Sequence, residues 1–543
     1  MTLISVATRS DTVQNRQCNV PSKDSHSDLM ESSATDLDDD NVISELIGDG
    51  GRWQFTWALL VFVFQIPTTM HMFTFVFQTT HKDFWCARPD HLKSINTDLW
   101  KNLTQPLGLC TILDIDYSRF DASNFEETMS NLSTSNLDFR KCTKFEYDDS
   151  KMGPTITSDY NLICDQVNML SVVEMCFLAG AAVGSVTSGW ISDKYGRKHI
   201  LMIFVTMQVV IGTLISFTTS LHMYMVLRII IGFASMTVTV VSFVLVVEYV
   251  SGRWRIIIGI LNLLPVPLSY VITAGIAYVA REWRLMQILT SSPWVILLVM
   301  WYWLPESPRW LLSNGKIDKL KISLEQAARM NGQVLPSNFE KTLEVYSQRE
   351  KAEISTKEPV LAVFNKEFRK TTILVIIVWY SMILLYFGLT LHLNNLGGDI
   401  YMNTVISGLL EAFTICISIP IVLKIGMRPS VVSYMVIAGV ACLGVNFVPE
   451  GNLWIIIMLA IIGKCLIGAN NAMVSTYTAQ QYPTMIRNFA VGVGNFAAGL
   501  ALITIPYMWL LERVQVYLPM SIMGCAGIVA GIGLYLIKNN PQV

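Results

Sequence analysis

Long apolar stretches with almost no charged residues recur along the chain and alternate with shorter polar segments. Each stretch is close to the roughly 20 residues that an α-helix needs to cross a bilayer core. Strands of a membrane β-barrel would be about half as long and would alternate in polarity, which these do not. The pattern predicts an all-α membrane protein with 12 transmembrane helices, at 53–78, 166–189, 199–218, 223–247, 256–280, 287–304, 371–392, 402–423, 429–448, 453–474, 489–511 and 517–537.

Two connecting segments are much longer than the others and divide the chain. One follows the first apolar stretch, and the second separates the first six stretches from the last six. We therefore expect a six-helix bundle in each half. The predicted units are an acidic, disordered cytoplasmic tail at 1–52, a first bundle at 53–304 with a large loop at 79–165, a central segment with short helices at 305–370, a second bundle at 371–537 and a tail at 538–543.

The composition narrows the class of protein. Only 15% of the residues are charged, against roughly 25% in soluble domains. The formal net charge of -2 gives no reason to expect a nucleic-acid partner. We find no Ser/His/Asp set, metal-spaced His/Cys cluster or phosphate-binding loop, and Gly492 to Gly494 lies inside an apolar stretch, where small residues favour helix packing. We expect neither an enzyme nor a cofactor.

The short polar links predict the orientation, because cytoplasmic loops of membrane proteins are enriched in Lys and Arg. The basic links all fall on the side that also holds both termini and the central segment, which places that side in the cytoplasm and 79–165 outside. Arg281 and Arg284 are exceptions to the rule. The basic residues that follow it include Lys194, Arg197, Lys198, Arg253, Arg255, Lys424, Arg428 and Arg487.

The segment 79–165 has features expected of an extracellular loop. Its four cysteines, an even number in an oxidising compartment, predict two disulfides with three pairings open. Two glycosylation sequons begin at Asn102 and Asn131. The cysteines are Cys86, Cys110, Cys142 and Cys164.

The two halves of the chain resemble each other near the ends of the fourth and tenth stretches. Glu248 precedes Arg255 by seven residues, and Gln480 precedes Arg487 by the same number. Together with the six-plus-six pattern, this spacing predicts two related bundles around a central cavity, which is a transporter layout.

The sharpest local pattern lies in the link between the second and third stretches, from Gly189 to Lys198, and has the form Gly-x-x-x-Asp-Lys-x-Gly-Arg-Lys. We expect Gly189 to allow close backbone contact and Gly196 to permit a tight turn. Asp193 can pair with a cation, and Arg197 and Lys198 would hold the loop in the cytoplasm.

This pattern resembles the loop signature of the major facilitator superfamily. Pro305 to Leu311, after the sixth stretch, is similar to a motif of its organic ion and sugar porter branches, and the large first outer loop favours the organic ion branch. The chain thus resembles the organic cation/carnitine/organic anion transporter family, solute carrier family 22, over about 48–537, and looks closest to the carnitine and organic cation members. Further matches are Cys86 to Pro89, Tyr386 to Leu389, Gly398 to Ile400, Tyr482 to Thr484 and Arg487 with Asn488.

The resemblance implies transport by alternating access, in a multi-pass glycoprotein of the plasma membrane. Asp193, Arg197, Glu248 and Arg255 would form a charge cluster that holds the inner gate shut, with Arg487 serving the second half. Gln480 replaces the usual Glu, and the link from Lys424 to Arg428 has no acid. We therefore expect a weaker gate in the second half.

Ionisable residues inside an apolar stretch are costly, so a functional role is their default interpretation. Glu411 would attract a cationic solute or bind a coupling ion, or it would be the structural partner of Lys464. Lys464 is accordingly a binding, gating or structural residue. Trp379 and Tyr386 lie seven residues apart on one helix face and match family positions that line the site. Their rings would attract ammonium groups, unless they only pack against neighbouring helices or lipid.

One position limits the choice of substrate. Gly499 stands where cation transporters of the family have Asp and anion or carnitine members have Arg, and Met382 replaces an acid of some cation members. With Glu411 and aromatic residues remaining, the sequence favours small organic cations or zwitterions. An organic anion carrier and a non-transporting receptor or scaffold on a transporter fold are the alternatives, and no coupling ion is identified.

Overall fold

The computed structural model describes residues 39–80, 82–131, 138–150, 152–336, 339–355, 363–391, 399–449, 452–482 and 484–536. Within these residues it has 12 helical segments long and apolar enough to cross a membrane, which confirms the predicted number and fold class. Their bounds fall within a few residues of the apolar stretches. They are formed by α3 (Arg52–Phe62) with α4 (Gln65–Gln78), α8 (Asn168–Tyr195), α9 (Arg197–Ile215), α10 (Leu221–Tyr249), α11 (Gly252–Leu261) with α12 (Pro265–Ala280), α13 (Trp283–Ser291) with η5 (Ser292–Val299) and α14 (Met300–Trp303), α18 (Arg369–Leu391), α19 (Ile400–Ile425), α20 (Met427–Val445), α21 (Leu453–Gln480), α22 (Thr484–Leu510) and α23 (Leu518–Tyr535).

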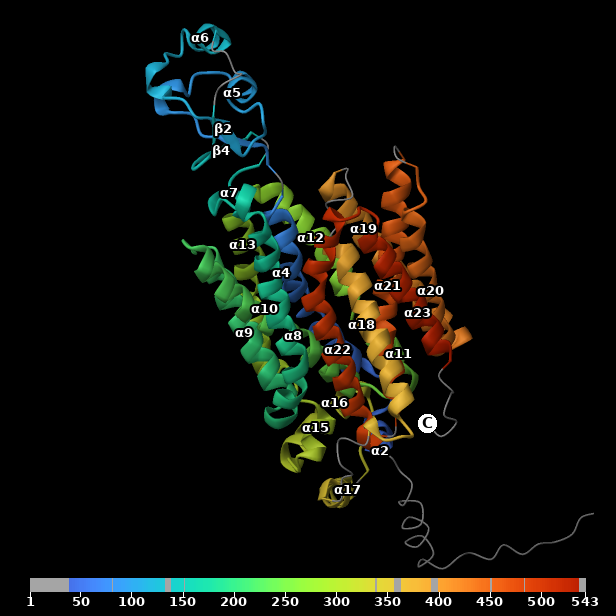
Figure 1. Cartoon of the computed structure of the whole chain (residues 1–543). Helices are drawn as coiled ribbons and strands as arrows, with labels where there is room; N and C mark the ends of the chain where they lie inside the picture. Colours follow the sequence, from blue (N-terminus) through green and yellow to red (C-terminus); the bar gives the residue numbers. More distant parts are fainter. Residues whose placement is uncertain are drawn as a thin grey trace, which may run out of the picture.

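The spans form two bundles that stand side by side (Figure 1). The six spans up to α14, coloured blue to green, make up the first bundle, and the six from α18 onward, coloured amber to red, make up the second. The bundles meet mainly where α8 packs against α22 and α12 packs against α19. A small residue makes the second contact close, because a Cβ atom at Gly408 would lie 2.7 Å from the carbonyl oxygen of Pro267.

Two spans are interrupted in ways that an apolar run does not reveal. The first span breaks at Val63 and Phe64, and the fifth breaks between Leu261 and Pro265. In each case the preceding helix ends about four residues before a proline, Pro67 or Pro265. A proline ring has no N–H and collides with the carbonyl four residues earlier, so it ends or bends a helix there.

Four short helices lie at one end of the bundles and are called the helical cap here. On α16, Leu320, Leu324 and Ala327 are buried and belong to one hydrophobic cluster with residues of the first bundle. The α2 helix corrects the expectation that all of 1–52 is disordered, because Ile43 and Ile47 lie on one of its faces and are buried in the same hydrophobic cluster. Residues 1–38 lie outside the described residues. The cap consists of α2 (Asp39–Ile47), α15 (Pro308–Ser313), α16 (Ile317–Asn331) and α17 (Phe339–Ser355).

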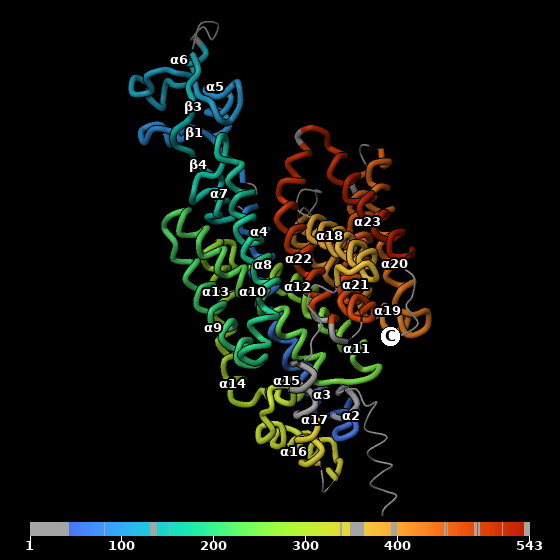
Figure 2. The backbone as a smooth tube through the Cα atoms, turned by 60° about the horizontal axis from the view of Figure 1, so that its bottom comes forward, coloured from blue at the N-terminus to red at the C-terminus, as the bar shows by residue number. Residues whose placement is uncertain are grey.

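A small folded unit, called the disulfide domain here, lies at the opposite end of the bundles (Figures 1 and 2). Disulfides join Cys86 to Cys142 and Cys110 to Cys164, which is one of the three possible pairings. Two short antiparallel strand pairs, which the apolar pattern does not predict, surround a core that includes the fully buried Trp100. The domain contains β1 (Phe84–Cys86), α5 (Thr97–Thr104), β2 (Thr111–Leu113), α6 (Phe125–Asn131), β3 (Phe139–Lys141), β4 (Phe145–Tyr147) and α7 (Ile156–Asp159).

The cation at position 284, which breaks the charge rule, has a structural reason. Arg284 donates to the carboxylate of Asp159 at 3.2 Å and to the carbonyl oxygen of Ser216 at 2.7 Å. Asp159 also accepts from the indole of Trp283 at 2.8 Å. Arg284 therefore fastens the disulfide domain to the first bundle.

Candidate functional site

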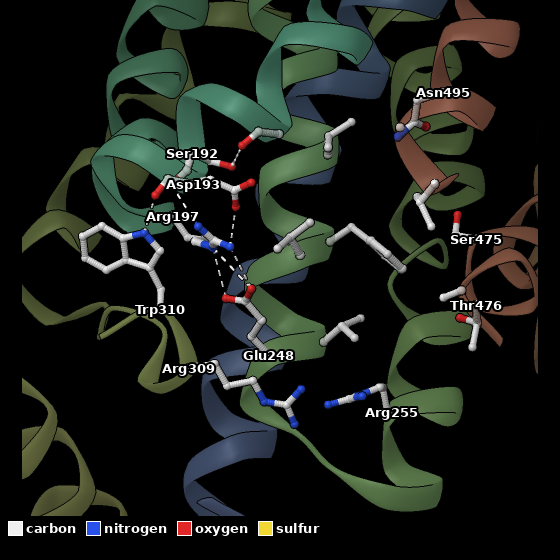
Figure 3. Close-up of a pocket in the computed structure, with 18 of the residues that line it drawn as sticks. Ser192, Asp193, Arg197, Glu248, Arg255, Arg309, Trp310, Ser475, Thr476 and Asn495 are labelled. Atoms are coloured by element: carbon white, nitrogen blue, oxygen red, sulfur yellow. Dashed lines mark hydrogen bonds and ion pairs between the residues drawn. The ribbon is translucent and has the colours of Figure 1, made fainter. Parts of the chain in front are cut away.

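A cavity of about 550 Å³ lies between the bundles in the half of the molecule nearer the helical cap. Its walls come from α8 and α10 of the first bundle, α21 and α22 of the second, and α15 of the cap (Figure 3). This volume is in the range of small-molecule sites, roughly 300–1,000 Å³. The polar residues that line it include Ser185, Ser192, Asp193, Arg197, Glu248, Arg255, Arg309, Ser475, Thr476 and Asn495.

A cluster of charged side chains stands on the first-bundle wall of the cavity. The Arg197 guanidinium contacts Asp193 at 2.6 Å and Glu248 at 3.0 Å, and it donates to the carbonyl oxygen of Ser192 at 3.0 Å. Gly196, with φ of +105°, makes the sharp turn that places Arg197 at the start of α9. The structure thus brings together three predicted gating residues, and Arg255 lines the same cavity.

The link between α8 and α9 is also held by residues that sequence reasoning treated only as family markers. The indole nitrogen of Trp310 donates to the carbonyl oxygen of Asp193 at 2.7 Å. The Glu306 carboxylate accepts from the backbone N–H of Lys198 at 3.0 Å. A Cβ atom at Gly196 would lie 2.6 Å from that carboxylate, so the close approach of Glu306 depends on glycine.

Gly189 does not make the close backbone contact expected of it. A Cβ atom at this position would meet no atom within 4 Å of the described residues, and Gly189 lines the cavity. Its lack of a side chain keeps space open. The close contact occurs instead at Gly499, where a Cβ atom would lie 3.2 Å from Ala182 Cβ and 3.3 Å from Ser185 Oγ. The position where the family resemblance led us to expect a charge is thus used for close packing of α22 against α8.

A second polar group is fully buried at the interface of the bundles, near the middle of the spans. The Tyr386 hydroxyl donates to Glu411 Oε1 at 2.9 Å, so its own oxygen accepts from the Tyr270 hydroxyl at 2.6 Å. On the other side, Lys464 Nζ lies 3.1 Å from Glu411 Oε2. Tyr270 belongs to the first bundle and the other three residues to the second.

The group therefore connects the two halves through one chain of polar contacts, called the buried chain here. Glu411, Lys464, Tyr270 and Tyr386 are each at most 2% exposed. Sequence reasoning identified three of them and left open the pairing of Glu411 with Lys464, which the structure shows. It missed Tyr270, because a tyrosine in an apolar stretch has no signal that distinguishes a polar contact from a lipid-facing position.

Trp379 lies two turns from Tyr386 on α18 and is 5% exposed. Its indole nitrogen donates to Thr478 Oγ1 at 3.0 Å, and its ring fills the space beside Gly494. Of the cavity-lining residues in the described part of the chain, none is Trp379, Tyr386, Glu411 or Lys464. The predicted binding residues are thus buried and do not line the cavity in this arrangement.

The first bundle holds a buried cation of its own. Arg228 is 3% exposed, donates to the carbonyl oxygen of His71 at 3.1 Å, and lies 4.9 Å and 4.6 Å from the ring centroids of Phe75 and Phe177. No site role was predicted for Arg228 from the sequence. His71, also buried, was missed, since a single histidine in an apolar stretch carries no spacing signal.

The remaining predicted residues lie at the periphery or outside the described side chains. Asn102 is exposed on α5. The side chains of Asn131 and Arg487 lie outside the described residues. Arg428, in the reduced second-half link, donates to the carbonyl oxygen of Tyr535 at 2.6 Å.

Comparison with known sequences finds a transporter family and several relatives that are named as transporters or solute carriers. Residues 125–538 match the family described as sugar (and other) transporter. The chain is 29% identical over 503 residues to "Organic cation transporter protein" of Drosophila melanogaster, with 91% of this chain and 90% of the relative covered. It is 28% identical over 512 residues to "Organic cation/carnitine transporter 2" of Homo sapiens, with 91% and 90% covered. "Solute carrier family 22 member 13" of Homo sapiens is 28% identical over 499 residues, with 90% and 89% covered.

Solved structures share the fold. The "partially occluded inward open conformation of the xylose transporter XylE from E. coli" aligns with a TM-score of 0.60 at 15% identity, covering 90% of this chain and 99% of that one. The proton:xylose symporter XylE of the major facilitator superfamily, bound to 6-bromo-6-deoxy-D-glucose, aligns with a TM-score of 0.57 at 17% identity, covering 89% and 96%. The twelve spans, the two bundles and these matches lead to one conclusion: the chain belongs to the sugar (and other) transporter family of the major facilitator superfamily, and it is similar to organic cation and carnitine transporters and other family 22 solute carriers.

Proposed function

We propose that this protein carries small organic cations or zwitterions, such as amine or carnitine-like solutes, across the plasma membrane by alternating access. One observation carries the proposal: a solute-sized cavity lies between the bundles toward one end, and the buried chain from Tyr270 to Lys464 joins the bundles beyond it. In this proposal the cavity opens toward one side only, because the buried chain closes the interface beyond it. The names of the relatives, which include organic cation and carnitine transporters, support the class of solute.

The proposed orientation places the helical cap in the cytoplasm and the disulfide domain, within 79–165, outside. The supporting observation is the basic residues of the links on the cap side. The tails at 1–52 and 538–543 and the central segment 305–370 are then cytoplasmic. In this orientation the cavity lies on the cytoplasmic side, as expected of an inward-facing carrier.

The inner gate in this proposal consists of the cluster around Arg197. When the bundles rock so that the cavity closes, the ends of α8 and α10 approach α21 and α22, which form the opposite wall. Arg197, held by Asp193 and Glu248, is then a rigid cation ready to meet polar groups of the second bundle. We assign Gly189, Lys198, Arg255 and Arg487 to the same gate.

Glu411 is the residue that we expect to recognise a positive charge. A carboxylate shielded from water interacts more strongly with a cation than an exposed one does. Tyr386 and Trp379 supply aromatic faces nearby, and cation–π contacts contribute about 0.5–2 kcal/mol each. An organic anion is the second candidate, because the cavity lining contains three arginines, Arg197, Arg255 and Arg309, but only two carboxylates, Asp193 and Glu248.

The test is uptake of a labelled panel into cells that express the protein. The panel contains tetraethylammonium as the cation, glycine betaine as the zwitterion and p-aminohippurate as the anion, and surface biotinylation measures the protein present. We expect tetraethylammonium or betaine to accumulate above control cells. Accumulation of p-aminohippurate alone favours the anion candidate, and accumulation of none with the protein at the surface would favour the scaffold interpretation.

Replacing Glu411 with Gln tests its role in the same assay. The Glu411→Gln variant keeps the side-chain volume and an oxygen that accepts from Tyr386, but it lacks the negative charge. We expect its uptake of tetraethylammonium to fall by at least about tenfold, since charge-assisted hydrogen bonds are roughly twice as strong as neutral ones. Uptake at the wild-type level would remove Glu411 from the proposed site.

A further inference from the structure

The ammonium group of Lys464 is held in the way that a bound organic ammonium would be held. Its Nζ atom lies 2.7 Å from Ser407 Oγ and 3.1 Å from Glu411 Oε2. It also lies 4.1 Å from the ring centroid of Tyr270. A carboxylate, a hydroxyl and an aromatic face are the groups that recognise an ammonium ligand in water-excluded sites.

The surroundings of this ammonium are closed and closely fitted. Lys464 is 1% exposed, and Ser407 and Glu411 are fully buried. Gly468, one turn beyond Lys464 on α21, leaves room for the carboxylate, because a Cβ atom there would lie 2.5 Å from Glu411 Oε1. The lysine therefore fills its site without leaving space for a second cation.

The contacts of Lys464 divide between the two bundles. Ser407 and Glu411 lie on α19, and Lys464 lies on α21, so these three move together with the second bundle. Tyr270 lies on α12 of the first bundle. In the proposed transport cycle, opening of the outer side would separate α12 from α19, so that Lys464 would lose the aromatic face and Glu411 would become accessible from the outer side.

We propose that Lys464 is a tethered cation, which occupies the ammonium site in the empty carrier and is displaced from Glu411 by a cationic solute. This inference rests on the proposed function. In this inference Lys464 has a specific role, because its ammonium group neutralises Glu411 whenever no solute is present. An unpaired buried carboxylate is strongly destabilising, so without Lys464 the empty carrier cannot pass through the closed arrangement, whereas the carrier loaded with a cation can.

The test separates net transport from exchange in reconstituted vesicles, with labelled tetraethylammonium as the probe. For Lys464→Met, net uptake into vesicles without internal cation should fall at least about tenfold, because the return of the empty carrier requires burial of a lone charge. Uptake into vesicles preloaded with unlabelled tetraethylammonium should stay within about twofold of wild type, a difference of less than about 0.5 kcal/mol. Lys366→Met, which removes an exposed lysine of the central segment just before α18, serves as the matched control and should change neither rate.

A second variant keeps the positive charge and strengthens the pair. Arginine forms bidentate pairs with carboxylates, so in Lys464→Arg the tethered cation competes more strongly with the solute. We expect net uptake to persist with a KM at least about threefold higher, which corresponds to about 0.65 kcal/mol. A lysine with a purely structural role would leave the KM unchanged when replaced by arginine.

The outcomes distinguish the two proposals. If net uptake and exchange by Lys464→Met fall in parallel, or if neither changes, the tethered-cation inference is wrong while the carrier proposal stands. Should Lys464→Met not reach the membrane, an unchanged KM of Lys464→Arg overturns the inference by itself. If the wild-type protein moves no member of the panel in either assay, the proposed function itself has failed.

Discussion

At the scale of single residues, the candidate site depends on groups that meet within a few ångströms although they lie far apart in the sequence. Glu411 and Lys464 contact each other at 3.1 Å from different helices, and Tyr270 reaches Tyr386 across the bundle interface at 2.6 Å. The lysine lies beside the carboxylate because Gly468 lets α21 pass close to α19. The position of the Glu411 carboxylate in the buried chain thus depends on the absence of a side chain at Gly468.

We predict that Gly468→Ala disrupts this fit. The added methyl group would lie 2.5 Å from Glu411 Oε1 and 3.1 Å from the Tyr386 ring, so the carboxylate must shift from its partners. Overpacking of this kind costs about 1–3 kcal/mol, and uptake should fall by about tenfold or more. Surface biotinylation and labelled uptake measure the effect.

The matched control for this substitution is Gly275→Ala. Gly275 is exposed on α12, and a Cβ atom there would meet none of the described residues within 4 Å. It should transport like wild type. Wild-type uptake by Gly468→Ala as well would show that the observed geometry of Glu411 does not matter for transport.

Sequence reasoning reached part of the site at this scale. The cost of burying a charge made Glu411 and Lys464 identifiable, and their partnership was one of the interpretations left open. It could not place Tyr270, Ser407 or Gly468, because hydroxyls and small residues are common in membrane helices for packing reasons alone. The close backbone contact expected at Gly189 is absent among the described residues for a related reason. The sequence alone does not distinguish a glycine that packs against a helix from one that faces an open cavity.

At the scale of elements, apolar length located every span to within a few residues, because the bilayer thickness sets the number of residues required. The same signal did not predict the breaks before Pro265 and near Pro67, since a proline also occurs in unbroken helices, as Pro420 does in α19. It also missed α2, where an acidic composition hid the apolar face of Ile43 and Ile47.

The helical cap gives a prediction at this scale, centred on Asn331 at the end of α16. Its side-chain oxygen accepts from the backbone N–H of Trp53 at 2.9 Å, and its amide donates to the carbonyl oxygen of Ile47 at 3.0 Å and to Gln54 Oε1 at 2.9 Å. Asn331→Ala leaves these groups without their partner. We expect a loss of about 1–3 kcal/mol of stability, seen as a lower Tm of the detergent-purified protein.

Gln326→Ala, on the exposed face of the same helix, is the comparison for this measurement and should leave the Tm unchanged. Equal melting temperatures for Asn331→Ala and wild type would mean that α16 does not fasten α2 and α3 in solution.

At the scale of the whole molecule, the proposal of alternating access rests on two features, the cavity toward one end and the buried chain that connects the two bundles beyond it. The proposed orientation in the membrane rests on the basic residues of the links between the spans. The basic links on the cap side follow the charge rule, whereas Arg284 lies on the other side because it fastens the disulfide domain through Asp159. A direct measurement of which end faces outward is therefore informative.

Glycosylation provides that measurement. Asn102 is exposed in the disulfide domain and begins a sequon, so a domain outside the cell is expected to carry a glycan there. We predict that treatment with an N-glycosidase increases the gel mobility of the wild-type protein and that Asn102→Gln removes part of the shift. The second sequon, at Asn131, accounts for the remainder.

Asn124→Gln, an exposed asparagine of the same domain without a sequon, should leave the shift unchanged. If N-glycosidase treatment does not change the gel mobility of the wild-type protein, the prediction of glycosylation is wrong. Glycosylation would then give no support for an extracellular disulfide domain.

The contacts of Asn331 also bear on the order in which the protein is made. Asn331 is separated from Trp53 by 278 residues, yet it completes a hydrogen-bonded junction entirely within the first half and the helical cap. Translation proceeds from the N-terminus and domains generally fold as units, so α16 leaves the ribosome after the sixth span and before the seventh. The junction of α16 with α2 and α3 can therefore form before any helix of the second half has been made.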